Sequence, residues 1–116
     1  MKFIEEVVVE QFLPTVRSML AEQLRDRGLT QQEVAAALGI SQSAVSKYAH
    51  GDVARQEDVL SDTSVEEVGE RVSDGLATGD MSRVQARVEI EVLIRRLEDG
   101  ALLARLHQQA LPEIAE

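Results

Sequence analysis

The chain has 116 residues, no cysteine, two histidines and a formal net charge of −9. This length supports one compact domain, or one domain with an appended helical segment. The lack of cysteine excludes disulfides, thiolate metal sites and a catalytic thiol, and two histidines are too few for a His-rich metal cluster. Hydrophobic residues make up 44% of the chain but aromatic residues only 3%, so the core must be built from aliphatic side chains, which favours helices.

The first apolar segment, residues 3–12, contains three consecutive valines between glutamates. The spacing of its large apolar residues favours a helix, although Val7, Val8 and Val9 alone would suit a strand. Its glutamates interrupt the apolar region that a signal peptide needs, and no run approaches the roughly 20 apolar residues that cross a bilayer. We therefore expect a helix here, in a cytoplasmic protein with no membrane partner.

Residues 14–27 are predicted to form the next helix. Pro14 disfavours helix at Leu13 and is itself suited to the first helical position. Gly28 supplies the end signal, and Leu29 is expected to pack into the core. Four apolar residues face inward at helical spacing: Val16, Met19, Leu20 and Leu24.

Residues 30–51 hold the densest set of helix start and stop signals in the chain. Thr30 and Glu33 form a T-x-x-E capping box, so a helix is expected to start at Gln31. Gly39 ends that helix, Ser41 caps a second one, and Gly51 closes it. Small Ala35 suits the point where two steeply crossing helices come closest. The pattern predicts two short helices joined by a tight turn.

The second of these helices has one apolar and one polar side when projected at about 100° per residue. Ala44, Val45 and Tyr48 share the apolar side, where Tyr48 is expected to be core with its hydroxyl at the rim. The polar side is narrow and carries no acidic residue. It consists of Gln42, Ser43, Ser46, Lys47 and His50.

The segment resembles the helix-turn-helix of the lambda-repressor-like, or XRE-type, regulators. The resemblance implies an all-α fold that binds double-stranded DNA and places its second motif helix in the major groove. The residues that match the family pattern are Gln31, Ala35, Gly39, Ile40, Val45 and Tyr48. The candidate DNA-binding residues are Gln31, Gln32, Ser41, Gln42, Ser43, Ser46, Lys47 and His50.

Gln42 is the main candidate for reading a base. A glutamine amide can donate and accept at once, which matches the N6 and N7 groups of adenine; the alternative is a contact to phosphate alone. Ser43 and Ser46 can donate to bases or phosphates and so carry little specificity. Lys47 can reach guanine or the DNA backbone.

Three flanking residues have weaker expectations. The resemblance implies that Gln31 binds a phosphate and braces Gln42, whereas a solvent-exposed first-turn residue is the alternative. His50 lies at the far end of the polar stripe and is more often a surface residue than a reader. Arg55 lies beyond the helix and could contact a phosphate.

Residues 52–63 form a polar segment, in which a short helix is expected at 56–60. A second capping box is predicted at Ser64 and Glu67. The helix behind it should end at Gly79. Its buried stripe is Val65, Val68, Val72 and Leu76.

The next helix, from Asp80 or Ser82 to Asp99, is apolar on two sides. One side carries Met81, Val84, Val88 and Val92, and the other carries Ala86, Ile90, Leu93, Ile94 and Leu97. A peripheral helix of a small monomer needs only one buried side. The second must be covered by leucines of the helix that follows Gly100, by a partner subunit, or by both. Those leucines are Leu102, Leu103 and Leu106.

The charge is unevenly distributed. Residues 1–13 carry −2, residues 14–56 carry +1, and residues 57–116 carry −8. The motif is thus free to face phosphates while the acidic remainder repels them. With ten Arg, two Lys and many acids, the composition resembles that of salt-loving archaea; an ordinary acidic bacterial protein is the alternative. The remaining acid pairs, Glu66–Glu67 and Glu98–Asp99, lie at helix ends and not in an active site, so we expect no enzyme, no metal and no cofactor.

The chain as a whole resembles the amino-terminal region of haloarchaeal regulators, which is often followed by a thiamine-phosphate synthase-like domain. A thiamine-related effector is implied only if such a further domain exists. We expect a DNA-binding domain at residues 1–60 and a helical extension at 61–116, through which a homodimer would place residues 41–50 in successive major grooves. The alternatives are an antitoxin-like or adaptor protein whose acidic helices bind a protein, and the regulatory part of a thiamine-linked sensor.

Overall fold

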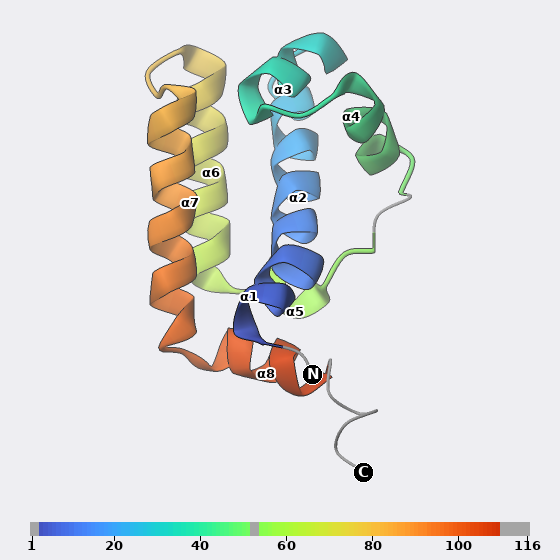
Figure 1. Ribbon diagram of the computed structural model, residues 1–116. Coiled ribbons are helices and arrows are strands. Elements are labelled where there is room, and N and C mark those ends of the chain that lie inside the picture. The colour runs from blue at the N-terminus through green and yellow to red at the C-terminus, as the bar shows by residue number, and fades with distance from the viewer. Residues whose placement is uncertain (1–2, 52–53, 110–116) are drawn as a thin grey trace.

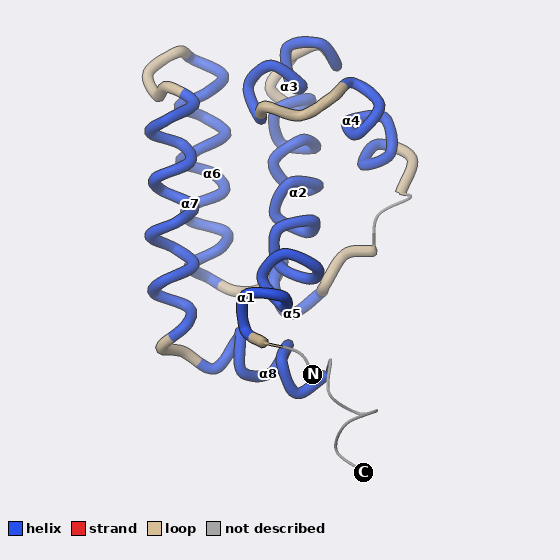
Figure 2. Tube along the Cα trace, in the orientation of Figure 1, coloured by secondary structure: helices blue, strands red, loops and turns tan. Residues whose placement is uncertain are grey.

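The computed structural model describes residues 3–51 and 54–109. In these two stretches every regular element is a helix and none is a strand, which confirms the predicted all-α class and the additional carboxy-terminal helices (Figure 2). None of the helices described is long and apolar enough to cross a bilayer.

The helices are arranged around one central helix, α2. The bounds are α1 Ile4–Val7, η1 Val8–Phe12, α2 Leu13–Asp26, α3 Gln31–Leu38, α4 Gln42–Ala49, α5 Glu57–Leu60, α6 Thr63–Thr78, α7 Arg83–Glu98 and α8 Ala101–Gln109. The antiparallel pair α6 and α7 lies beside α2 (Figure 1). Helices α3 and α4 lie at one end of α2, and α1, α5 and α8 lie at the other. The predicted motif therefore lies at the opposite end of α2 from α1, α5 and α8.

The amino-terminal segment is helical, as predicted, but Pro14 does not interrupt it. Leu13 has helical dihedral angles, φ −61° and ψ −41°, and its N–H donates to the carbonyl of Val8, a π-type bond. Pro14 has no N–H to offer and its ring crowds the preceding turn. The wider π turn at Val8–Phe12 makes room for that ring, so the chain continues into α2 without a break. The expected interruption at Leu13 is wrong.

The main core joins the amino-terminal helices to the carboxy-terminal ones. Phe12 and Val16 pack with residues more than 40 positions later, including Val72, Leu93 and Leu103, and each of these five is at most 1% exposed. The stripe predicted on α6 is correct, since Val65, Val68 and Val72 are buried and Leu76 packs against the same cluster.

A buried threonine ties the segment after α4 to this core. The hydroxyl of Thr15 donates to the carbonyl of Gln11 at 3.1 Å and accepts the N–H of Gln56 at 3.0 Å. Thr15 is 0% exposed, so both bonds form away from bulk water, where an unpaired group would be costly. The start of α5, which confirms the short helix expected near 56–60, is thereby held against α2.

The start of α6 differs from the predicted capping box. Asp62 is the N-cap, its carboxylate accepts the N–H of Val65 at 3.1 Å, and α6 already begins at Thr63. Ser64 therefore lies inside the helix, and the prediction of a box from Ser64 to Glu67 is wrong. A carboxylate at this position satisfies the free N–H and also favours the helix dipole. Gly79 ends α6 at φ 82° as expected.

Helix α7 begins at a capping box formed by Ser82 and Gln85. Its side with Ala86, Leu93 and Leu97 is buried, whereas the valines of the other side remain exposed. The leucines of α8 do not cover those valines. Leu102, Leu103 and Leu106 are at most 3% exposed and belong to the main core, where α8 contacts α1. Of the two ways predicted to cover the valine side of α7, packing by the α8 leucines is therefore not observed.

Candidate nucleic-acid interface

The pair α3 and α4 is held on the end of α2 by a small core of its own. Val34 and Leu24 are 0% exposed, Val45 is 2% exposed, and alanines fill the narrow spaces at Ala21 and Ala35. Tyr48 packs against this cluster and is half-buried. Because Val45 faces this core, the opposite side of α4 faces outward.

The local signals that start and end these helices are all present. The hydroxyl of Thr30 accepts the N–H of Glu33 at 3.1 Å, and the Glu33 carboxylate accepts the N–H of Thr30 at 2.9 Å. The bond from the Thr30 N–H to this carboxylate, and after it a side-chain hydrogen bond between the carboxylate and Thr30, hold the pKa of Glu33 below its ordinary value of 4.5. The carboxylate therefore stays ionised at the start of α3.

The turn between the helices depends on Gly39 and Ser41. Gly39 has φ 66° and ψ 34°, a left-handed conformation that is open to glycine without strain. The N–H of Ile40 donates to the carbonyl of Ala35 at 3.0 Å, and the hydroxyl of Ser41 accepts the N–H of Ala44 at 3.1 Å. Three residues thus turn the chain and start α4 at Gln42.

The predicted polar side of α4 is accessible. Ser46 is half-buried, and the other residues predicted on the motif are exposed: Gln31, Gln32, Ser41, Gln42, Ser43, Lys47 and His50. Neither Gln42 nor Lys47 is covered by the protein core. In the described part of the chain Lys47 forms no ion pair, and its ammonium group is therefore available to an incoming anion.

Gln31 makes the contact that links α3 to α4. Its Nε2 donates to the main-chain carbonyl of Gln42 at 3.0 Å. The bond is made to the backbone and not to the side chain of Gln42, so the first turn of α4 is fixed while the Gln42 amide stays unencumbered. One N–H of the Gln31 amide is left for another acceptor.

Two of the weaker candidates are engaged within the protein. The Nδ1 atom of His50 lies 2.7 Å from the carbonyl oxygen of Ser46 and 3.3 Å from its hydroxyl, which folds the imidazole back along α4. The Nη1 of Arg55 donates to Glu22 at 3.0 Å. Arg55 therefore faces α2, and the phosphate contact expected for it is not supported.

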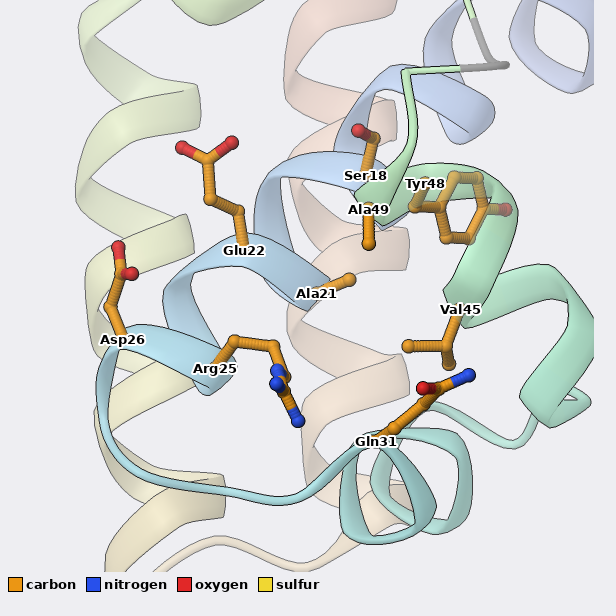
Figure 3. Close-up of a pocket in the computed structure, with 9 residues that line it drawn as sticks. All are labelled: Ser18, Ala21, Glu22, Arg25, Asp26, Gln31, Val45, Tyr48 and Ala49. Carbon is orange, nitrogen blue, oxygen red and sulfur yellow. The ribbon is translucent and has the colours of Figure 1, made fainter.

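An arginine that the sequence patterns did not single out lies next to Gln31. A cavity of about 260 Å³ lies beside the contact of α2 with α4, and Figure 3 shows Arg25 pointing toward Gln31, while Glu22 and Asp26 point away. Arg25 also donates to the carbonyl of Leu29 at 3.4 Å. No local signal could reveal this position, because it depends on how α3 folds back over the end of α2.

The site thus consists of two short helices that are joined by a glycine turn and have a buried inner side and a polar outer side. The comparison with protein families agrees with this geometry. Residues 20–60 match the helix-turn-helix family model. The matched helix-turn-helix domain covers all of α3 and α4 and supports a DNA-binding, XRE-type regulator in general, a class that is generally not enzymatic. No curated protein and no solved structure matches the chain. The expected haloarchaeal relationship and thiamine-linked domain stay predictions.

Proposed function

We propose that the chain is a sequence-specific transcriptional regulator that reads the major groove of DNA with α4 and acts as a homodimer on two half-sites. The observation that supports this most directly is the orientation of α4. Val45 is 2% exposed, whereas Gln42, Ser43 and Lys47 are exposed, so the helix offers DNA its polar side only.

Gln42 is the base-reading residue in this proposal. It is the first residue of α4, and recognition helices contact base edges with residues near their amino-terminal ends. Its amide is matched to adenine, because the amide NH2 can donate to N7 while the amide oxygen accepts from the N6 amino group. The bond from Gln31 to the Gln42 carbonyl keeps the backbone of this turn in place, so the Cα atom from which the Gln42 side chain extends is held in position.

The phosphate contacts come from the rim of the same surface. The remaining N–H of Gln31, the ammonium of Lys47 and the guanidinium of Arg25 are suited to phosphate oxygens. Ser41, Ser43 and the exposed Gln32 add neutral donors. Because few cations are available in a chain with a net charge of −9, binding would depend more on hydrogen bonds and shape than on counterion release.

The test is selection of bound duplexes from random DNA at several salt concentrations, followed by affinity measurements on the selected operator. Gln42→Ala should relax the base preference at one operator position and weaken binding by about 1–3 kcal/mol. Lys47→Ala should weaken binding to all sequences and reduce the salt slope by about one per copy. A matched control is Gln108→Ala, since Gln108 is an exposed glutamine on α8, far from α4 (Figure 1).

An unchanged affinity and unchanged base preference in Gln42→Ala would reject the assignment of α4 as the reading helix. If the wild-type chain selects no sequence but co-purifies with a stoichiometric protein, the adaptor alternative replaces the present one.

A further inference from the structure

Three exposed valines form a stripe along α7. Val84 is 69% exposed, Val88 50% and Val92 42%. They are spaced by four residues, so they follow one side of the helix over about 12 Å. The part of the chain that the structure describes has only two other exposed large hydrophobic residues, Phe3 and Val9. An apolar stripe of this kind on a peripheral helix indicates a contact surface.

A groove lies directly beside the valine stripe. It has a volume of about 730 Å³, runs between α2 and α7 and has α6 as its floor. Val84 belongs to both the stripe and the groove, and the groove lining is mainly aliphatic: Leu13, Leu20, Leu38, Leu76, Ile90 and Ile94. From Leu13 to Leu20 the α2 wall extends about 10 Å, which is close to the length of the valine stripe. A ridge and a groove of similar length thus lie side by side on one molecule.

The rim of the groove on α7 has an ordered sequence of charges. Projection at about 100° per residue places Arg83, Arg87, Glu91 and Glu98 within about 80° of one another, between the valine stripe and the buried side. The first two are basic and the last two are acidic. Arg87 and Glu91 form an exposed pair at 3.4 Å, with side chains 78% and 53% exposed. In the described residues Arg83 has no ion-pair partner.

This order of charges is self-complementary in one orientation. If two α7 helices lie antiparallel and cross near residue 90, the same rim of each helix faces the other. Arg87 of one copy then lies opposite Glu91 of the second. The same crossing point brings Val88 of one copy against Val92 of the other. A closed two-fold contact has this reciprocal property, in which each residue pair occurs twice.

The size of the surface also favours a second copy over a contact between two isolated helices. The 16 residues of α7 present a strip about 24 Å long and about 10 Å wide, which is well short of the roughly 800 Å² per partner of a stable interface. Stable association therefore needs the groove as well as the stripe. An antiparallel two-fold pair brings in both, because the stripe of one copy packs on the stripe of the other while the walls of the two grooves face each other beside it.

We propose that a second copy of this chain docks antiparallel along α7, with the valine stripes of the two copies packed on each other and the α2–α7 groove of each copy facing that of the other. Helices α7 and α4 lie on opposite sides of α2 (Figure 1), so this contact leaves both reading helices exposed, one toward each end of the pair. The inference names the surface of the proposed homodimer. Its test needs no DNA, so failure of DNA binding and failure of self-association are separate results.

The experiment is sedimentation equilibrium of the full chain at protein concentrations up to about 1 mM, so that dimers with dissociation constants as weak as about 1 mM are detected. The wild type should self-associate to a dimer. Val88→Asp should weaken the dimer at least 100-fold, because it places a charge at the centre of the contact. Val9→Asp, which changes an equally exposed valine elsewhere, should leave it unchanged. Circular dichroism checks that both variants stay folded.

The orientation is tested by charge reversal. Arg87→Glu makes the rim acidic at both positions and Glu91→Arg makes it basic at both positions, so each variant alone should dimerise at least tenfold more weakly. Mixing the two should restore association as a heterodimer, and the double exchange should restore a homodimer. Both positions are exposed, so the monomer fold is little affected. A wild type that stays monomeric, a Val88→Asp dimer of unchanged affinity, or a mixture that fails to recover overturns the proposal.

Discussion

Truncation of Val45 tests whether the small core beneath the helix-turn-helix holds α4 on α2. Val45→Ala removes two methyl groups from a side chain that is 2% exposed. At about 0.8 kcal/mol per buried carbon the lost transfer free energy is roughly 1.6 kcal/mol. The cavity left behind adds up to about 1 kcal/mol. Part of that cavity can close, because this cluster contains few buried residues, so we expect the free energy of unfolding to fall by about 2 kcal/mol.

The assay is urea denaturation followed by the helical circular dichroism signal, at a concentration where the chain is monomeric. The matched control is Val9→Ala, which removes the same two methyl groups from a valine that is 60% exposed and should change stability by less than about 0.5 kcal/mol. If Val45→Ala is no more destabilising than Val9→Ala, the small core does not hold α4 and the reasoning about the orientation of the polar side is wrong.

Two further predictions concern the turn and the pair α6–α7. Gly39→Ala should destabilise the protein by about 1–2 kcal/mol because Gly39 has φ 66°. The control Gly100→Ala, at a glycine without positive φ, should not have this effect. Equal midpoints of thermal unfolding for the two variants would contradict this. Glu89 accepts two bonds from Arg71, at 3.2 and 2.9 Å, and the hydrogen bond is the main cause that lowers the pKa of Glu89 below 4.5. Its stabilising effect, below about 1 kcal/mol at this exposed site, is therefore fully present above the unfolded pKa and is lost as the pH falls through the lowered folded pKa. Glu89→Gln should be less stable than the wild type at pH 7 and equally stable once the carboxylate is protonated, and a gap that persists in acid would show that the charge is not responsible.

The start and stop signals of the motif could be predicted because they are local. The capping box of Thr30 and Glu33, the cap formed by Ser41 and the left-handed turn at Gly39 all join atoms within a few residues of one another. Such bonds form in the same way wherever the segment lies in the fold. The same argument failed at Ser64, because Asp62 two residues earlier offered a competing cap and both residue types are good N-caps.

Features that join distant segments could not be predicted in this way. The π turn at Val8–Phe12 accommodates Pro14 because α2 is held in line by the main core, and Arg55 turns to Glu22 across 33 residues of sequence. The position of Arg25 next to Gln31 likewise appears only when α3 folds back over α2. Each depends on which helices become neighbours, and periodicity along one helix carries no information about that.

By itself, the sequence determined where the helices of the motif begin and end and which side of α4 is polar, since these follow from hydrogen bonds and side-chain spacing within single helices. Helix α7 shows the limit of such reasoning, because it has two apolar sides and the spacing of residues along the sequence cannot distinguish the buried side from the exposed one. Only tertiary packing decided that Ala86, Leu93 and Leu97 are buried and that Val84, Val88 and Val92 remain exposed. The leucines of α8 lie at the other end of the bundle, where they are buried in the main core and cannot cover that stripe.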